Sequence, residues 1–413
     1  MLPFSPLKTW GLGLVSWVLL AAGVYCIWVW AAEPKSVTVE RHTVPDAARE
    51  DDARMVVNDV KVRHNWPFLA AGIGMLAISF GGFMPVSFLL GKSGDSTPRV
   101  IDPGQVIKVD RPDGSQLHVE VFGANEKPTI VFTHGWSLNS SCWGYQQRAL
   151  AKRFRIVLWD LPGLGQSKGP PSGDYSIDKM ARDLEAVVQV AGKGPIILVG
   201  HSIGGMITQT LCRLLPEMLG PRVAGVVLLH TTYTNPLRTA FLAPLWTALE
   251  KPLLVPLNYL MMWLAPLAWL QNLQSYLNGS LHIATRISSF AGEQTRQQVE
   301  YGARLFIKAW PGVVARGNLE MLRFDELGTL PDVDIPVLVI GSKYDRLTKC
   351  EASEEMENKL AQGVLATVPA GHLGLWEQHT EVNQLLIEFV ERLTDHKGEG
   401  RDVAVPNAVV AKD

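Results

Sequence analysis

One short segment places a serine between small residues in a way that suits nucleophilic chemistry. Gly200-His-Ser-Ile-Gly204 follows an apolar run typical of a strand, and an apolar helical pattern begins directly after it. A G-x-S-x-G sequence in that context predicts a sharp strand-to-helix turn that exposes the Ser202 hydroxyl. A serine that only caps a helix is the alternative, but the preceding strand favours the turn. Ser202 is therefore the candidate nucleophile.

A serine hydroxyl needs a base to take its proton, and that base needs a carboxylate to orient it. Downstream, the strand predicted at 337–341 leads into a loop with Asp345, and the next strand leads into a loop with His372. Both loops follow strands, as Ser202 does, so we predict a triad of Ser202, Asp345 and His372 at the carboxyl edge of one sheet. The competing histidines precede the acid in the chain, lie in an insertion or begin a helix: His230, His282 and His379.

Acyl transfer also requires hydrogen-bond donors for the negative charge of the tetrahedral intermediate. His134-Gly-Trp136 directly follows a predicted strand, and Gly135 lets the backbone approach a substrate closely. We predict the backbone N–H groups of Trp136 and Ile203 as the oxyanion hole. The residues expected to line the substrate pocket are Trp136, His201, Met261 and Trp263.

Strands and helices alternate from about residue 104 onward, which predicts a mostly parallel sheet with helices on both faces. A turn at 111–114 joins the first two strands as a hairpin. The predicted strands are 106–109, 117–122, 129–133, 155–159, 196–200, 225–230, 337–341 and 364–368. The predicted helices are 146–152, 177–190, 202–215, 351–360 and 381–393.

With these motifs the chain from about 104 to 393 resembles the α/β-hydrolase superfamily, as a serine esterase- or lipase-like member. The matching segments are His134-Gly-Trp136, Trp159-Asp-Leu-Pro-Gly-Leu-Gly-Gln-Ser167, Gly200-His-Ser-Ile-Gly-Gly205, Asp345 and Gly371-His372. The resemblance implies a serine hydrolase of carboxylic esters with a helical cap inserted at 231–334. Members that open epoxides or remove halide use Asp as the nucleophile, and Ser202 argues against both reactions. Asp160 is expected to anchor loops near the site.

The motifs do not select the substrate. An acyltransferase, a thioesterase or a carbon–carbon hydrolase would use the same triad, and a non-catalytic lipid-binding membrane protein is the alternative from another class. The four cysteines are far apart and match no metal spacing, so we expect neither a metal nor a cofactor. Lys and Arg total 38 against 40 for Asp and Glu, which indicates no nucleic-acid partner. Nothing in the sequence indicates an oligomeric state.

The N-terminal part has the composition of a membrane anchor. Residues 9–32 and 65–91 carry no charged side chain, and about 20 apolar residues cross a bilayer as a helix. A signal peptide is the alternative for the first run, but its apolar region is only about 7–15 residues long. We predict two transmembrane helices that form a hairpin. Six basic residues in the connecting segment place it in the cytoplasm by the positive-inside rule, and the hydrolase domain on the extracytoplasmic side.

The inserted segment is also strongly apolar, since 252–285 holds no Lys, Arg, Asp or Glu. A third span is excluded because the strands before and after the insertion must share one sheet, and Pro256 and Pro266 break the helix. The cap therefore packs on the core or also dips into the lipid interface, and both favour a hydrophobic, lipid-like ester substrate. The predicted regions are the anchor (1–95), the first core part (96–230), the cap (231–334), the second core part (335–396) and a disordered tail (397–413).

Overall fold

The computed structural model describes residues 5–32, 65–94 and 102–395, and the dipeptides 37–38, 41–42, 56–57 and 61–62. The predicted boundary at residue 95 and the predicted tail at 397–413 lie outside the described residues. Two small antiparallel ladders join β1 (Val37–Thr38) to β4 (Lys61–Val62) and β2 (Arg41–His42) to β3 (Val56–Val57).

The main sheet has eight strands, and six of them run parallel. The strands are β5 (Gln105–Asp110), β6 (Gln116–Phe122), β7 (Thr129–Thr133), β8 (Arg155–Trp159), β9 (Ile196–His201), β10 (Val223–Leu229), β11 (Val337–Ser342) and β12 (Gly363–Val368). Their order is β12-β11-β10-β9-β7-β8-β6-β5, and β6 pairs antiparallel with both β5 and β8. The predicted fold class is confirmed: the hairpin supplies the antiparallel edge and the alternating strands and helices supply the parallel part.

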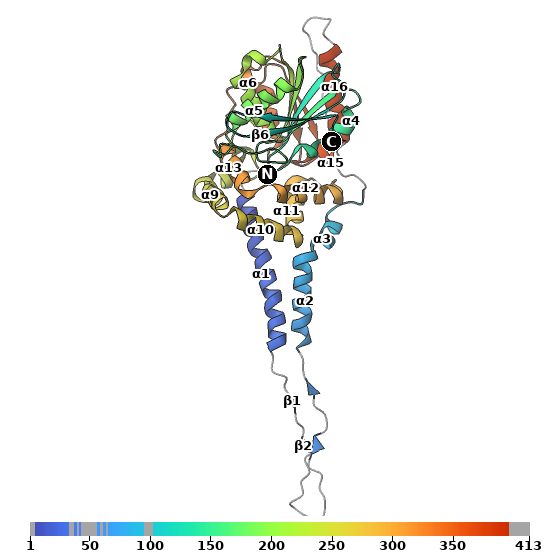
Figure 1. Ribbon diagram of the computed structural model, residues 1–413, viewed down its shortest axis with the longest axis vertical. Coiled ribbons are helices and arrows are strands. Elements are labelled where there is room, and N and C mark those ends of the chain that lie inside the picture. Colours follow the sequence, from blue (N-terminus) through green and yellow to red (C-terminus); the bar gives the residue numbers. More distant parts are fainter. Residues whose placement is uncertain are drawn as a thin grey trace, which may run out of the picture.

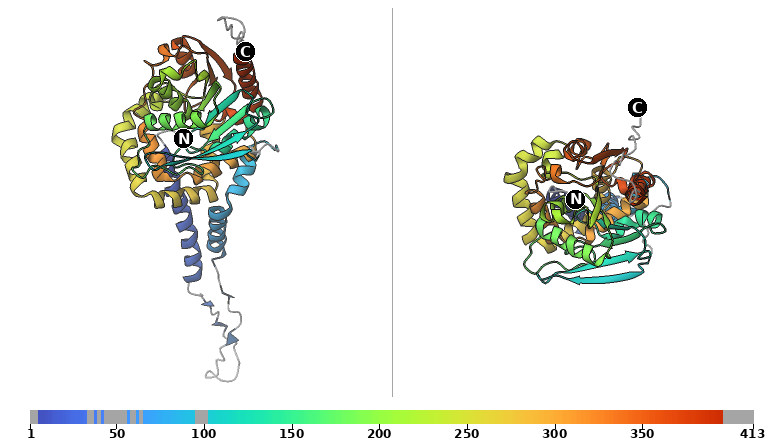
Figure 2. Two further views of the ribbon diagram at one scale, coloured as in Figure 1. Left: turned by 45° about the horizontal axis from the view of Figure 1, so that its top comes forward. Right: turned by 90° about the horizontal axis from the view of Figure 1, so that it is seen from above.

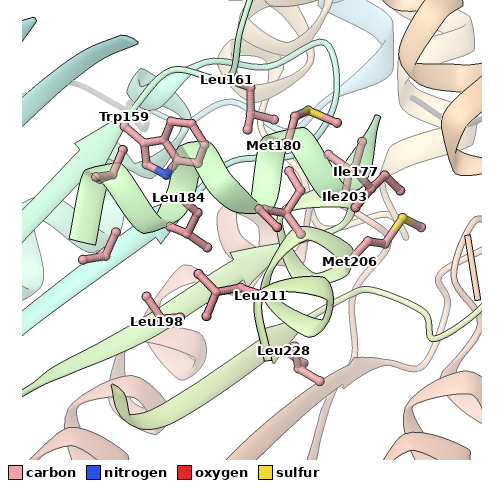
Figure 3. Close-up of a cluster of buried hydrophobic side chains, with 14 of the residues drawn as sticks. Trp159, Leu161, Ile177, Met180, Leu184, Leu198, Ile203, Met206, Leu211 and Leu228 are labelled. Carbon is pink, nitrogen blue, oxygen red and sulfur yellow. The ribbon is translucent and has the colours of Figure 1, made fainter. Parts of the chain in front are cut away.

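Both faces of the sheet are buried. In β7, Val131 faces one apolar cluster, whereas Ile130 and Phe132 face the other, as the alternation of side chains along a strand requires. Figure 3 shows part of the first cluster, to which Leu184 and Met206 from two helices and Leu198 from the sheet belong. The helices of the core are α4 (Gly144–Leu150), α5 (Ile177–Val190), α6 (Ile203–Leu214), α14 (Cys350–Lys359), α15 (Gly374–Glu377) and α16 (His379–Asp395), with 3₁₀ turns at Ser140–Trp143 and Pro216–Met218. A further 3₁₀ turn, Leu330–Asp332, lies at the end of the insertion.

The segment between β10 and β11 is helical. It contains α7 (Pro236–Thr239), α8 (Ala243–Leu249), a π-helical turn (Glu250–Leu254), α9 (Val255–Trp263), α10 (Ala265–Leu277), α11 (Ser280–Ser289), α12 (Arg296–Lys308) and α13 (Pro311–Met321). The pair α9 and α10 is bent by 99°, and Pro266 lies in the first turn of α10, where a proline is tolerated. Because β10 and β11 are parallel neighbours in one sheet, both ends of this segment lie in the same globular core.

Two helices project from the cap side of the globular part. Figure 1 shows α1 (Ser5–Ala32) and α2 (Trp66–Gly81) side by side, and Figure 2 shows the same arrangement from a second direction. The first residues of α1 lie among the cap helices, where Trp10 packs against the large apolar cluster of the core. Among the described residues, Pro6–Ala32 is the one helix that is long and apolar enough by itself to cross a membrane.

The second predicted span is bent. An angle of 65° separates α2 from α3 (Phe83–Leu90), so the uncharged run 65–91 forms two helices that meet at Gly82, and its crossing of the membrane stays a prediction. A Cβ at Gly82 would lie 2.6 Å from the backbone oxygen of Asn278, so a glycine at the bend is needed for the chain to pass so close to the end of α10. Pro85 has no N–H to offer and fits the first turn of the new helix better than the middle of a long one.

The projecting helices pack closely on each other. A Cβ at Gly72 in α2 would meet Ile27 at 2.6 Å and the backbone oxygen of Gly23 at 2.9 Å, so only glycine allows this approach. Small residues at a helix crossing are typical of helices that associate in lipid. At the far end, the rings of Trp30 and Trp66 lie 6.2 Å apart, where aromatic residues of a membrane interface are expected.

Candidate active site

The candidate nucleophile occupies a strained turn between β9 and α6. Ser202 has φ 55° and ψ −121°, a conformation that is rare for a residue with a side chain. A Cβ at Gly200 would lie 2.3 Å from the backbone oxygen of Gly204, and one at Gly204 would lie 2.3 Å from that of Thr133. The small residues that flank the serine are therefore required by the backbone itself.

The structure brings the three predicted triad residues together at the carboxyl ends of β9, β11 and β12. The Ser202 hydroxyl oxygen lies 3.0 Å from Nε2 of His372, and Nδ1 of His372 lies 2.7 Å from Oδ2 of Asp345. All three side chains are buried. With Nδ1–H donating to the carboxylate, Nε2 is an acceptor for the serine proton, which is the arrangement that a general base needs.

Several donors hold the Asp345 carboxylate. Its Oδ1 accepts from the backbone N–H groups of Leu347 (2.7 Å) and Thr348 (3.0 Å), and its Oδ2 accepts from the Thr348 hydroxyl at 2.8 Å. Burial alone would raise the pKa of Asp345, but the charge and the hydrogen bond of His372 outweigh burial and hold this pKa below its usual value. Asp345 is therefore charged at neutral pH.

Thr348 was not among the predicted site residues. Its hydroxyl oxygen also lies 3.3 Å from Nδ1 of His372, so it contacts both partners of the pair. The only signal for it in the sequence is a threonine three residues after the acid, a common local pattern in turns.

Two further histidines lie behind His372. Nε2 of His201 donates to the backbone oxygen of His372 at 3.0 Å, and the ring of His230 lies 6.0 Å from that of His201. Burial lowers the pKa of His201 well below its usual value, and His372 and His230 act in the same direction. Burial also lowers the pKa of His230 to about 4. Both rings are neutral at pH 7, and His201 supports the loop of His372 from behind.

A buried glutamate joins the loop of His372 to the cap. The Glu377 carboxylate accepts from the backbone N–H of Gly371 at 2.9 Å, and from those of Ala291, Gly292 and Glu293 at 2.8–3.0 Å. The latter three follow α11, so one side chain fixes the end of a cap helix to the histidine loop. Sequence reasoning missed this residue because its partners are backbone groups about 85 positions away.

The predicted oxyanion donors flank the serine. Ile203 is the first residue of α6, and the N–H groups of a first helical turn have no acceptor within the helix. A Cβ at Gly135 would lie 3.4 Å from the Cβ of Ser202, so the Gly135–Trp136 segment runs directly past the hydroxyl. The indole of Trp136 is buried and donates to the backbone oxygen of Val314 in α13 at 3.0 Å.

The four predicted pocket residues lie in different environments. Trp136 and Met261 belong to one buried cluster, and His201 lies beneath His372 rather than on an open wall. Trp263 is 80% exposed, so its predicted place in the pocket is wrong. It is the last residue of α9, and the bend that follows leaves its side chain on the outer surface of the cap.

Asp160 has the structural position that was expected of it. One carboxylate oxygen accepts from the backbone N–H of Ser140 at 2.7 Å and the other from that of Gln166 at 2.8 Å. It therefore ties together the two loops that follow β7 and β8. Within the described part of the chain, no group of three or more His, Cys, Asp or Glu residues is arranged to hold a metal ion.

Comparisons with known proteins agree with this geometry. Residues 128–378 match the sequence profile of the family described as alpha/beta hydrolase fold. The AB hydrolase superfamily protein YisY of Bacillus subtilis is 26% identical over 291 residues, which cover 66% of this chain and 94% of that protein. The bifunctional epoxide hydrolase 2 of Sus scrofa is 25% identical over 316 residues, covering 67% and 54% of the two chains. The structure of a thermophilic esterase from Thermogutta terrifontis superposes with a TM-score of 0.57 at 25% identity, covering 70% and 99%.

Proposed function

The chain belongs to the α/β-hydrolase family, and from that premise we propose that it is a serine hydrolase that cleaves carboxylic esters through an acyl-enzyme on Ser202. The observation that carries the proposal is the line of contacts from the Ser202 hydroxyl through His372 to Asp345, at 3.0 and 2.7 Å. One relative is described as an epoxide hydrolase. We do not propose epoxide opening for this chain, because the turn after β9 carries the hydroxyl of Ser202 rather than a carboxylate.

The contacts assign a step to each group. Ser202 Oγ attacks the ester carbonyl carbon and its proton passes to Nε2 of His372, while Asp345 stabilises the resulting imidazolium. The oxyanion accepts from the backbone N–H groups of Trp136 and Ile203. His372 then gives the proton to the leaving alcohol, and the acyl group stays on Ser202. A water molecule that His372 deprotonates attacks the acyl-enzyme, which releases the acid and restores Ser202.

The second half of the proposal concerns the membrane. Pro6–Ala32 can cross a bilayer by its length and composition, and we propose that α1 and α2 anchor the enzyme as a hairpin, with the hydrolase domain on the extracytoplasmic side. The substrate would be a hydrophobic, lipid-like ester. Proteolysis of intact cells or spheroplasts tests the orientation, because cleavage of the hydrolase domain is expected before lysis, and cleavage only after lysis would reverse it.

The chemistry is tested with full-length protein in detergent or nanodiscs. Wild type is expected to hydrolyse p-nitrophenyl acyl esters and to react with a fluorophosphonate probe, and Ser202→Ala is expected to do neither. The matched control is Ser172→Ala, which removes an exposed hydroxyl from a loop and should leave both readouts unchanged. Normal labelling of Ser202→Ala would refute the assignment of the nucleophile. A series of acyl chain lengths tests the substrate class, since the proposal expects a preference for longer chains.

A further inference from the structure

Helix α10 buries polar side chains and exposes apolar ones, which is unusual for a helix in contact with water. The residues that it buries include Gln271, Gln274 and Ser275, whereas Leu267, Trp269 and Leu270 are exposed at 39–42% each. A helix on the surface of a soluble domain has the reverse pattern, with its apolar stripe toward the core. In lipid, exposed apolar side chains cost nothing and polar groups must find partners inside the protein.

The buried polar groups of α10 have partners on the projecting helices. The amide of Gln274 donates to the backbone oxygen of Ser79 in α2 at 3.0 Å. The amide of Asn278, which follows α10, donates to the hydroxyl of Ser16 in α1 at 2.7 Å, and that hydroxyl lies 3.3 Å from the one of Ser275. The polar side of α10 therefore forms a seam with both projecting helices, away from its apolar outer face.

Two neighbouring helices continue this outer face. In α11, His282, Thr285 and Ser289 are buried while Ile283 and Ile287 are exposed at 41% and 52%. The short helix α3 has no buried residue and exposes Met84, Phe88 and Leu89 at 61–80%. Figure 1 shows α10, α11 and α3 at the end of the globular part from which α1 and α2 project. Helix α10 also packs against α1, whose Leu14, Val15 and Val18 are 59–65% exposed.

The length of α2 fits the same arrangement. Its 16 residues span about 24 Å at about 1.5 Å per residue, which is less than the roughly 30 Å of a hydrocarbon core. The difference between the length of α2 and the thickness of the hydrocarbon core is about half the diameter of a helix. Helix α10 lies across the cap end of the hairpin, where it would fill that difference. Charged side chains begin at Arg286 in the last turn of α11, which donates to the backbone oxygen of Phe290. They continue in α12, where Glu300 accepts from Tyr276 and Arg304, and Lys92 pairs with Glu293.

We infer that α10, α11 and α3 form a floor of the cap that is immersed in the acyl-chain region of a lipid bilayer. The inference rests on the proposed membrane anchoring and adds to it a second membrane contact, made by the domain that covers the catalytic residues. Because the backbone oxygen of Ser289 at the end of α11 accepts from the N–H of Leu373 at 2.9 Å, a single helix then lies between lipid and the loop of His372.

Spin labels on full-length protein in nanodiscs test the inference. Cys26 and Cys350, which are partly exposed, are replaced by alanine, and the buried Cys142 and Cys212 are kept. Single cysteines for nitroxide labelling are then introduced as Leu270→Cys or Ile287→Cys in the floor. The controls are Val18→Cys in α1 and Gln384→Cys, an exposed position on α16 in the core. Circular dichroism and the thermal unfolding midpoint of each variant, compared with wild type, verify that the hydrolase core is folded.

The readout is collision with oxygen, which concentrates in lipid, against collision with a water-soluble nickel chelate. The inference expects labels at 270 and 287 to follow the label at 18, with oxygen collisions dominant, and the label at 384 to show the reverse. Water-like labels at 270 and 287 beside a lipid-like label at 18 would overturn the immersed floor and leave the anchor standing. A water-like label at 18 as well would overturn the anchor together with the floor. Neither result depends on whether Ser202 is the nucleophile.

Discussion

Two helices of similar length, α5 in the core and α10 in the cap, bury opposite kinds of side chain. Helix α5 turns Met180 and Leu184 toward the sheet and leaves Asp178 and Arg182 exposed. Helix α10 turns glutamines and a serine inward and leaves leucines and a tryptophan outside. The contrast is the one that the proposed membrane contact expects: water around the core, and lipid around the floor of the cap and the anchor.

The difference also separates two tasks. The core holds the three proposed catalytic groups within hydrogen-bond distance, using glycines that a strained turn demands. The cap and the anchor hold no motif for chemistry, but their buried polar seam ties the cap to both projecting helices. Glu377 and α11 then connect the cap to the histidine loop. The proposed chemistry and the proposed membrane contact are therefore joined by a few named contacts, and each side can be perturbed separately.

The largest expected effect separates chemistry from anchoring. Asp345→Asn should lower kcat by about 10⁴-fold, because the amide no longer selects the tautomer of His372 that accepts the serine proton. Membrane association should not change. Asp334→Asn is the control, since that carboxylate lies at the opposite edge of the sheet and accepts from the exposed side chain of Gln362. Kinetics with a p-nitrophenyl ester measure the effect, and a loss of less than tenfold would argue against the role of Asp345.

Alanine substitutions of one leucine in α5 and one in α10 compare how strongly the two helices are packed. Leu184→Ala in α5 should lower the free energy of unfolding by about 2–5 kcal/mol, because it leaves a cavity in a packed core. Leu270→Ala in α10 should lower it by about 1 kcal/mol or less in nanodiscs, because this side chain is 40% exposed and its loss leaves no enclosed cavity. Equal losses at both positions, measured by thermal unfolding at the same pH, would show that Leu270 is packed and that the contrast between the helices is mistaken.

The dependence of the free energy of unfolding on acidic pH tests a buried group of the core, His230. The usual pKa of histidine is 6.5, and burial lowers that of His230 to about 4, so the unfolded chain takes up a proton first as the pH falls. Stability from this group is complete above pH 6.5 and declines between 6.5 and 4, by about 3 kcal/mol at most. His230→Asn, which tolerates the positive φ of this position, should flatten that decline. An unchanged slope of the unfolding midpoint against pH would contradict the account of His230.

The smallest expected effect concerns the polar seam. Gln274→Leu removes the donor to the backbone oxygen of Ser79 and should destabilise the docking of α2 on the cap by about 1–3 kcal/mol. Proteolysis of nanodisc-embedded protein near the cap should become faster, while the hydrolysis of a short, water-soluble ester stays close to that of wild type. Asn272→Leu on the same helix is the control, because Asn272 is only partly buried and makes no such contact with α2. Equal rates of cleavage in the two variants would mean that the seam does not hold the helices together.

The core could be predicted from the sequence much further than the cap. In the core, short apolar runs mark the strands, and those at Thr129–Thr133 and Arg155–Trp159 have the predicted bounds. The two glycines that flank Ser202 likewise mark the turn. In the cap, residues 252–285 include no Lys, Arg, Asp or Glu, so no alternation of charged and apolar positions indicates which face of a helix is buried. The bend at Gly82 was missed because glycine is common in straight membrane helices as well. Glu377 could not be found because its partners are backbone groups distant in the chain.

The most direct measurement of the central claim is to trap the acyl-enzyme. Full-length protein is mixed with a p-nitrophenyl ester, quenched in acid within the first turnover and digested for mass spectrometry. The account predicts a burst of p-nitrophenol and an added acyl mass on the peptide that contains Ser202, and neither in the Ser202→Ala variant. An ester that is hydrolysed with no acyl mass on Ser202, or with that mass on another residue, would contradict the proposed mechanism.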